Sequence, residues 1–200
     1  MLEDLTFKSL GIANYHETLD LMKSHIRSEN FNNEIWLLEH PPIFTLGTAA
    51  DLNHILNAKD IPVVQSDRGG EVTYHGPGQL VIYFLLDVKK LDFGPKKLVH
   101  TIQSFVKDLL KEISIDCNFV KGAPGVYVDK KKIASIGLRI SKGKSYHGIS
   151  LNFDMDLSPF KQINPCGYEG LEVTQIKDLN QDISKLQLEK LAIDLLRNIF

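Results

Sequence analysis

The stretch Leu80-Val81-Ile82-Tyr83-Phe84-Leu85-Leu86 decides the fold, because it is the longest uninterrupted apolar run in the chain. A strand without polar alternation is buried on both faces, so this run predicts a central strand covered by a layer on each side. The run is far shorter than the roughly 20 residues that a membrane-spanning helix needs. The sequence therefore predicts a globular core around residues 80–86 and no transmembrane segment.

Outward from this strand, the spacing of apolar residues predicts a mixture of strands and helices. Further strands are predicted at 35–38, 43–46, 62–65, 125–128, 132–140 and 146–153, and the last three predict an antiparallel meander. Helical spacing runs from Tyr15 to Ile26, from Leu98 to Ile113 behind Pro95, and through a C-terminal segment behind Ser184 and Gln187, which have capping-box spacing. The predicted fold class is α/β, with an α+β mixed sheet.

Composition is that of an ordinary globular protein, and the length of 200 residues predicts a single domain over 1–200. The 23 basic and 25 acidic residues give a net charge of −2, so no overall field draws the chain onto nucleic acid or a membrane. Acidic Glu3 and Asp4 stand where a signal peptide has a basic region. We therefore expect a cytoplasmic protein that binds neither nucleic acid nor membranes.

The two cysteines, Cys117 and Cys166, are too few for a disulfide framework and are spaced unlike zinc ligands, so we expect free thiols and no metal. For either residue the simplest interpretation is a small buried hydrophobe. Cys117 fits that role at the end of a predicted helix. Cys166, between Pro165 and Gly167 in an irregular stretch, is the better candidate nucleophile.

Residues 68–79 read Arg-Gly-Gly-Glu-Val-Thr-Tyr-His-Gly-Pro-Gly-Gln, an unusual density of glycine. Glycines let backbone amides approach a ligand closely, and Arg68 can offer it a forked donor or a charge. The spacing matches neither a Walker loop nor a Rossmann fingerprint. From the pattern alone, a ligand-binding loop and a purely structural set of tight turns are equally good interpretations.

Strict alternation along residues 132–140 places Lys132 on one face with Ala134 and Ile136, and Ile133 on the opposite face. A lysine on an apolar face loses hydration of its ammonium group, which makes it a candidate acid, base or counter-ion. A solvated hairpin lysine is the alternative interpretation. The same count places His147 with Ile149, where a neutral, hydrogen-bonded core histidine is the simpler alternative.

Several ordered motifs resemble the lipoyl(octanoyl) transferase family, which moves an octanoyl group from acyl carrier protein to a lysine of lipoyl domains. The motifs are Arg68-Gly69-Gly70 through Thr73, 75–81, 122–127, Lys132-Ile133-Ala134, 137–139, His147-Gly148 with Asn152, and Asn164-Pro165-Cys166-Gly167. They span residues 68 to 167, and a weaker resemblance of Leu46-Gly47 and of the N-terminal helix leaves only the final helix without a motif. The resemblance implies a mixed α/β domain related to the catalytic domains of biotin and lipoate protein ligases.

The resemblance further implies that Cys166 accepts the acyl group and that Lys132 stabilises its thiolate and shuttles a proton. It also implies a substrate site lined by Arg68, Gly69, Gly70, Glu71, Val72, Thr73, Tyr74, His75, Ser135, Ile136, Gly137, Gly148, Ile149 and Ser150, with His147 as a possible supporting residue. The implied partners are octanoyl-acyl carrier protein and the lipoyl domains of 2-oxoacid dehydrogenase complexes and of the glycine cleavage H protein. No cofactor is expected, and we expect a monomer.

Two further expectations concern the reaction and its partners. Backbone amides near Ser135 to Gly137 are candidate donors to an oxyanion. A basic patch that docks acidic carriers is expected among Lys89, Lys90, Lys96, Lys97, Lys130, Lys131, Lys142 and Lys144. Two rival interpretations are an ATP-dependent lipoate or biotin protein ligase, which would need no cysteine, and a non-catalytic module that only binds acyl carrier or lipoyl domains.

Overall fold

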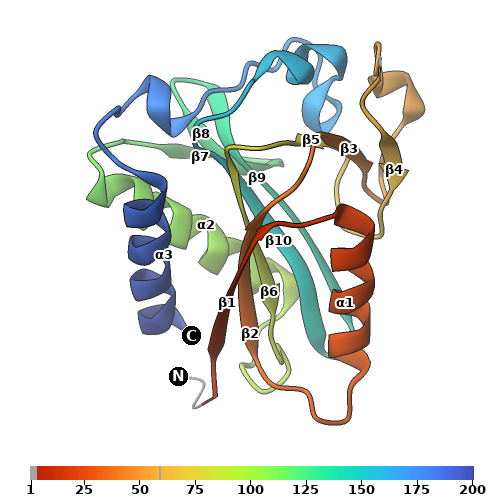
Figure 1. Cartoon of the computed structure of the whole chain (residues 1–200), viewed down its shortest axis with the longest axis vertical. Helices are drawn as coiled ribbons and strands as arrows, with labels where there is room; N and C mark the ends of the chain where they lie inside the picture. The colour runs from red at the N-terminus through yellow and green to blue at the C-terminus, as the bar shows by residue number, and fades with distance from the viewer. Residues whose placement is uncertain (1–3, 59) are drawn as a thin grey trace.

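The computed structural model describes residues 4–58 and 60–200 and is organised around a seven-stranded sheet (Figure 1). The strands lie in the order β1 (Thr6–Ile12), β2 (Glu34–Glu39), β6 (Gln79–Leu85), β10 (Lys144–Asn152), β9 (Lys131–Ser141), β8 (Ala123–Val128) and β7 (Asn118–Val120). Only β1 and β2 pair in parallel, so the sheet is mixed. The predicted meander of β8, β9 and β10 is confirmed.

Helices cover both faces of this sheet, as the apolar run at residues 80–86 predicts. Leu80, Ile82 and Phe84 of β6 pack with α2 (Pro95–Glu112) and α3 (Lys185–Ile199) in the main hydrophobic cluster. Val81 and Tyr83 point to the other face, where α1 (Tyr15–Arg27) covers them. Each such fully buried apolar side chain contributes about 1.5–3 kcal/mol, so β6 anchors both layers.

A second, three-stranded sheet lies beside the first and has the order β4 (Val63–Gln65), β3 (Ile43–Leu46), β5 (Val72–His75). Its apolar side is filled by Phe44, Tyr74 and Phe160, the last from the 3₁₀ helix η2 (Ser158–Gln162). Three more 3₁₀ turns are η1 (Leu52–His54), η3 (Pro165–Gly167) and η4 (Ile176–Asp178). Residues 72–75 therefore form a strand inside the glycine-rich segment, where the sequence pattern indicates only a loop or tight turns.

One residue corrects the predicted face of Lys132. Val126 pairs with Ala134 but Tyr127 pairs with Lys132, so Ile133 is an extra residue, a β-bulge in β9. Ile133 and Ala134 both pack in the main hydrophobic cluster, although strict alternation placed them on opposite faces. The bulge shifts Lys132 out of the apolar row, and the predicted sharing of a face with Ala134 and Ile136 was wrong.

His147 also departs from the predicted alternation. Its φ of 60° lies in the left-handed region and turns its side chain away from the face of Ile149. The imidazole instead lies edge-on to Tyr83, with ring centroids 5.9 Å apart. The predicted grouping of His147 with Ile149 was therefore wrong, although the side chain is buried and hydrogen-bonded as the simpler alternative proposed.

Within residues 4–58 and 60–200, no helix is both long and apolar enough to cross a membrane. The signal-peptide expectation rests partly on residues 1–3, which lie outside the described part of the chain.

Candidate active site

Lys132 and Cys166, 34 positions apart, meet at one end of the large sheet. Lys132 Nζ donates hydrogen bonds to Cys166 Sγ at 2.7 Å and to the Pro124 carbonyl oxygen at 3.0 Å. The lysine side chain lies 5.2 Å from the centre of the Tyr127 ring and the residue is only 2% exposed. A buried ammonium with one sulfur partner is the arrangement that stabilises a thiolate.

Backbone contacts on both sides fix Lys132. Its N–H donates to the Glu172 carbonyl at 2.9 Å, and its carbonyl accepts from Thr174 N–H at 3.0 Å. Gly125 passes directly over the side chain with a φ of 144°, and a Cβ there would lie 2.8 Å from Lys132 Cε. The lysine side chain is thus enclosed by the bulge, by the segment around residue 173 and by Gly125. These contacts hold its amine beside Cys166.

Cys166 occupies the middle of the tight 3₁₀ turn η3, with a φ of 58°. The turn is tied down by Asn164 N–H, which donates to the His54 carbonyl at 2.8 Å, and by Gly167 N–H, which donates to the Asn164 carbonyl at 3.0 Å. Cys166 is partly exposed. Cys117, by contrast, packs against the main hydrophobic cluster, and burial raises the pKa of its thiol.

A cavity of about 200 Å³ opens beside Cys166. It lies between the glycine-rich segment and the middle of strands β6, β9 and β10, and its exposed wall is mostly apolar. Its lining comprises Tyr15, Arg68, Gly70, Glu71, Val72, Thr73, His75, Val81, Tyr83, Gly122, Pro124, Ser135, Ile136, Gly137, His147, Gly148, Ile149, Ser150, Cys166 and Tyr168. For scale, an apolar cavity of about 150 Å³ can hold benzene.

Most residues expected at the substrate site lie on this cavity, and two do not. Tyr74 points to the opposite side of β5 and packs on Phe160. Gly69 lines a neighbouring groove instead. Sequence reasoning missed Tyr15 and Tyr83, which were assigned to the core, and Tyr168 at the mouth, whose hydroxyl donates to the Gly122 carbonyl at 3.5 Å.

Arg68 lines the cavity, but its guanidinium is already engaged. It donates to Thr45 Oγ1, to the Thr45 carbonyl at 2.6 Å, to the Gly69 carbonyl at 3.0 Å and to the Glu71 carbonyl at 2.7 Å. The expected forked donor to a ligand is thus used to shape the loop. Arg68 contributes positive charge and a fixed backbone to the site.

The far side of the cavity is a cluster of buried aromatic and imidazole rings. His40 bridges the Ala13 carbonyl and the Tyr83 hydroxyl, both at 2.7 Å, while His75 Nδ1 lies 2.7 Å from Gln79 Oε1. Burial lowers the pKa of His40 to about 4 and holds that of His75 well below its usual range. These histidines are therefore neutral at pH 7 and form a wall without charge.

His147 is held by an acid. Its Nε2 lies 2.8 Å from Asp67 Oδ1, and the Tyr146 hydroxyl donates to Asp67 Oδ2 at 2.6 Å. Burial lowers the pKa of His147, and the bond to Asp67 partly opposes this effect. Burial and the bond to Asp67 raise the pKa of Tyr146 to about 12. His147 is thus oriented from behind, with its ring edge toward Tyr83.

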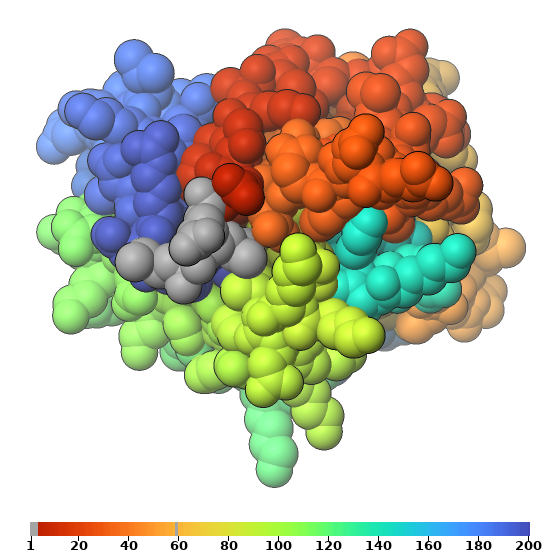
Figure 2. Space-filling model, turned by 90° about the horizontal axis from the view of Figure 1, so that it is seen from below, coloured from red at the N-terminus to blue at the C-terminus, as the bar shows by residue number. Residues whose placement is uncertain are grey.

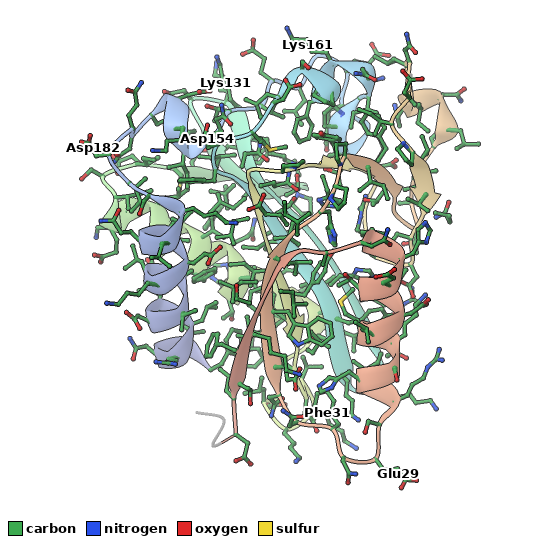
Figure 3. The ribbon with its side chains drawn as sticks, viewed as in Figure 1. Glu29, Phe31, Lys131, Asp154, Lys161 and Asp182 are labelled. Atoms are coloured by element: carbon green, nitrogen blue, oxygen red, sulfur yellow. The ribbon has the colours of Figure 1, made fainter. Side chains whose placement is uncertain are left out.

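The eight lysines expected to form a docking patch do not share one surface. The 87–91 and 141–144 turns lie side by side at the lower end of the molecule (Figure 2), where Lys89 N–H donates to the Gly143 carbonyl and Lys144 Nζ lies 4.1 Å from the centre of the Phe31 ring. Lys131 lies at the opposite end, the end that carries η3 (Figure 3). The length of β9 separates Lys131 from the lysines of the 141–144 turn, so the eight lysines do not form one patch, and a smaller local patch among them stays a prediction.

Comparisons with known proteins place this geometry in a family. The family model "Lipoyl protein ligase A/B catalytic domain" matches residues 14–198. An octanoyltransferase from Pseudomonas putida is 54% identical over 88% of this chain and 82% of its own length. One from Vesicomyosocius okutanii is 50% identical over 90% and 89%. The chain belongs to the lipoyl protein ligase A/B catalytic-domain family, and within it to the octanoyltransferases, which are acyltransferases.

Solved structures support the same fold at low sequence identity. A lipoate-protein ligase A bound with ATP has a TM-score of 0.74 and 14% identity, covering 100% of this chain and 85% of that one. A biotin protein ligase from Aquifex aeolicus has a TM-score of 0.59 and 15% identity, covering 100% and 69%. The predicted relation to biotin and lipoate ligase domains is confirmed. Since ligases and transferases share this fold, the chemistry has to be argued from the site.

Proposed function

We propose that this cytoplasmic enzyme, acting as a monomer, transfers an octanoyl group from octanoyl-acyl carrier protein to a lysine of lipoyl domains. The acceptors are those of 2-oxoacid dehydrogenase complexes and of the glycine cleavage H protein. The observation that carries the proposal is the 2.7 Å contact of Lys132 Nζ with Cys166 Sγ at the cavity. An octanoyl thioester of Cys166 is the intermediate.

In the first step the Cys166 thiolate attacks the carbonyl carbon of the carrier thioester. The new carbon–sulfur bond forms, the tetrahedral intermediate collapses, and the carrier's sulfur leaves with the bonding electron pair. The Lys132 ammonium gives that sulfur its proton, so the carrier departs as a thiol and Lys132 becomes neutral. Lys132 Nζ contacts the Pro124 carbonyl oxygen, Cys166 Sγ and the Tyr127 ring, and none of these three groups is a carboxylate that would compete for the proton.

In the second step the neutral amine of the acceptor lysine attacks the octanoyl thioester. Lys132, now neutral, accepts the proton that the amine loses as the amide bond forms. Cys166 leaves as a thiolate beside the renewed Lys132 ammonium, and the starting state is restored. Water and ATP have no part in this cycle.

We infer that one backbone amide of the expected oxyanion region faces the cavity. The Leu138 carbonyl accepts from Gly69 N–H, so the backbone N–H and C=O of Leu138 point away from β10. Every second residue of an antiparallel strand has this orientation, so the N–H of Ile136 also points away from β10. β8 stops pairing at Ala134, and the Ile136 side chain packs in the main cluster although the residue lines the cavity. Ile136 N–H is therefore our candidate donor to the oxyanion.

The cavity accounts for the acyl group. At about 0.8 kcal/mol per buried methylene, the six methylenes of an octanoyl chain contribute roughly 5 kcal/mol. The chain would run along β9 from Cys166 past Ser135 to Gly137, where Tyr83 and His147 close the cavity. Neutral His75 and His147 place no charge against it.

A transfer assay with purified octanoyl-acyl carrier protein and an unmodified lipoyl domain tests the proposal. We expect ATP-independent modification of the domain by the wild type and by Cys117→Ser, and none by Cys166→Ser. Modification that requires ATP and free octanoate, with pyrophosphate release, would instead identify a ligase. Carrier binding without turnover in the wild type would identify a non-catalytic module.

A further inference from the structure

Thr73 carries the one polar side-chain atom among residues 4–58 and 60–200 that is fully buried and lacks a hydrogen-bond partner. The residue is 5% exposed and lines the cavity beside Cys166. An unpartnered buried hydroxyl costs about 1–3 kcal/mol. In a binding cavity, a buried hydroxyl without a hydrogen-bond partner indicates that an atom of the bound ligand is its partner.

Neighbouring polar groups are already committed elsewhere. Thr45, which pairs with Thr73 across β3 and β5, accepts from the Arg68 guanidinium through its own hydroxyl at 2.9 Å. His75, two residues further along β5, is bound through Nδ1 to Gln79. The isolation of the Thr73 hydroxyl is therefore a property of its position and not of a loosely packed region.

The strand places this hydroxyl on the cavity that Cys166 also lines. Val72 and Tyr74 point into the hydrophobic cluster of the small sheet, so Thr73 points to the opposite face, toward the cavity. β5 packs directly against η3, the turn that holds Cys166. At the same contact, a Cβ on Gly167 would lie 3.4 Å from Glu71 Cγ, two residues before Thr73.

We propose that Thr73 Oγ1 donates a hydrogen bond to the carbonyl oxygen of the acyl group at Cys166 and is a second oxyanion donor. This inference rests on the proposed octanoyl transfer. A saturated octanoyl chain has a single oxygen, the carbonyl oxygen, and that oxygen lies next to the sulfur. No other oxygen of the acyl chain could be the partner of a buried hydroxyl in this cavity.

The hydrogen bond acts in both acyl transfers without transferring a proton. When the thiolate or the acceptor amine adds to the carbonyl carbon, the π electron pair moves onto the oxygen, and the Thr73 hydroxyl stabilises that negative charge. When the carbonyl re-forms, the charge returns to the departing sulfur. Because the hydroxyl is already dehydrated and unpartnered before substrate binds, forming this bond breaks no hydrogen bond of the free enzyme.

The test replaces Thr73 with valine, which keeps the shape and removes the hydroxyl, and with serine, which keeps the hydroxyl. We expect the single-turnover rate of octanoyl-Cys166 formation to fall about 100-fold in Thr73→Val, as for other oxyanion donors, and to stay within about fivefold of the wild type in Thr73→Ser. The carbonyl stretch of a ¹³C-labelled octanoyl-enzyme should rise in frequency in Thr73→Val.

Stability separates this role from a structural one. Removing an unpartnered hydroxyl leaves the urea midpoint of Thr73→Val unchanged or higher, whereas Thr45→Val, which removes an acceptor of Arg68, lowers it. Acylation of Thr73→Val within threefold of the wild type, or a midpoint lowered as in Thr45→Val, would overturn the inference alone. Failure of the wild type to form any octanoyl adduct would overturn the proposed function beneath it.

Discussion

Cys166 has a backbone conformation that residues with a Cβ rarely adopt, since its φ of 58° lies in the left-handed region. Such a conformation costs about 1–3 kcal/mol and persists only where surrounding contacts impose it. Here Asn164 is bound to the His54 carbonyl, and the turn closes on Gly167. In this conformation the sulfur lies 2.7 Å from Lys132 Nζ.

Lys132→Met keeps nearly the same volume and removes the ammonium, which gives the first prediction. We expect a properly folded protein whose transfer rate falls at least about 100-fold, the usual contribution of a positioned acid and base. Alkylation of Cys166 by iodoacetamide at pH 7 should slow as well, measured in a Cys117→Ser background so that one thiol reacts. Lys131→Met, the exposed neighbour, is the control and should be alkylated at the original rate.

Alkylation of Lys132→Met as fast as the control would show that the ammonium does not stabilise the thiolate.

Sequence motifs predicted both members of this pair, because each lies in a motif of its own. Their proximity could not be predicted from spacing, since the contact depends on how η3 folds back over β9. The sequence also could not predict that the Thr73 hydroxyl lacks a hydrogen-bond partner, because this depends on which side chains of β3 and β5 lie around it.

The element that makes the site is the bulge of β9. By inserting Ile133, the strand keeps its apolar side chains in the core and still turns Lys132 toward η3. Bulges re-aim side chains in this way beside many active sites. The alternation of apolar residues along 132–140 predicts the strand. The inserted residue Ile133 moves Lys132 to the opposite face, and no residue type near it marks the bulge in the sequence.

Gly125 gives the prediction at this scale. In Gly125→Ala the new Cβ would meet the Ala134 carbonyl oxygen at 2.7 Å and Lys132 Cε at 2.8 Å. We expect a loss of about 1–3 kcal/mol in the free energy of unfolding from overpacking. At a temperature where the variant is still folded, its transfer rate should also fall, because the new Cβ displaces Lys132 Nζ from the sulfur.

The matched control is Gly170→Ala, since Gly170 also has a positive φ, of 70°, but no atom within 4 Å of a new Cβ. In urea denaturation its free energy of unfolding should fall because of the backbone strain, while its transfer rate should stay that of the wild type. Equal transfer rates for the two variants would contradict a positioning role for Gly125.

Across the whole molecule, one large mixed sheet separates a mainly hydrophobic half from a half that contains the site. The face under α2 and α3 is filled by aliphatic and phenylalanine side chains. The face under α1 carries tyrosines and adjoins buried histidines and the cavity. The run at residues 80–86 predicts the two-sided burial. The strands β1 and β7 could not be predicted in the same way, because none of their residues is buried.

The buried histidines predict how stability depends on pH. Burial lowers the pKa of His40, His75 and His147 below the roughly 6.5 of an unfolded histidine. Below that pH the unfolded chain binds more protons than the folded one, so the free energy of unfolding falls as the pH falls. The slope is at most about 1.4 kcal/mol per pH unit for each histidine.

Urea denaturation between pH 7 and pH 5 measures this slope. In His40→Asn one of these three histidines is removed, so the slope should fall by up to one bound proton, about 1.4 kcal/mol per pH unit. Unfolding that is independent of pH in this interval would contradict neutral burial of the three histidines.

Transfer of the acyl group through Cys166 is the central claim, and a chase experiment tests it most directly. The enzyme is loaded from octanoyl-acyl carrier protein, freed of carrier, mixed with an unmodified lipoyl domain without ATP, and followed by intact mass. We expect one octanoyl adduct, absent from Cys166→Ser, to disappear at the rate at which octanoylated domain appears. An adduct that persists while the domain stays unmodified would contradict the covalent mechanism.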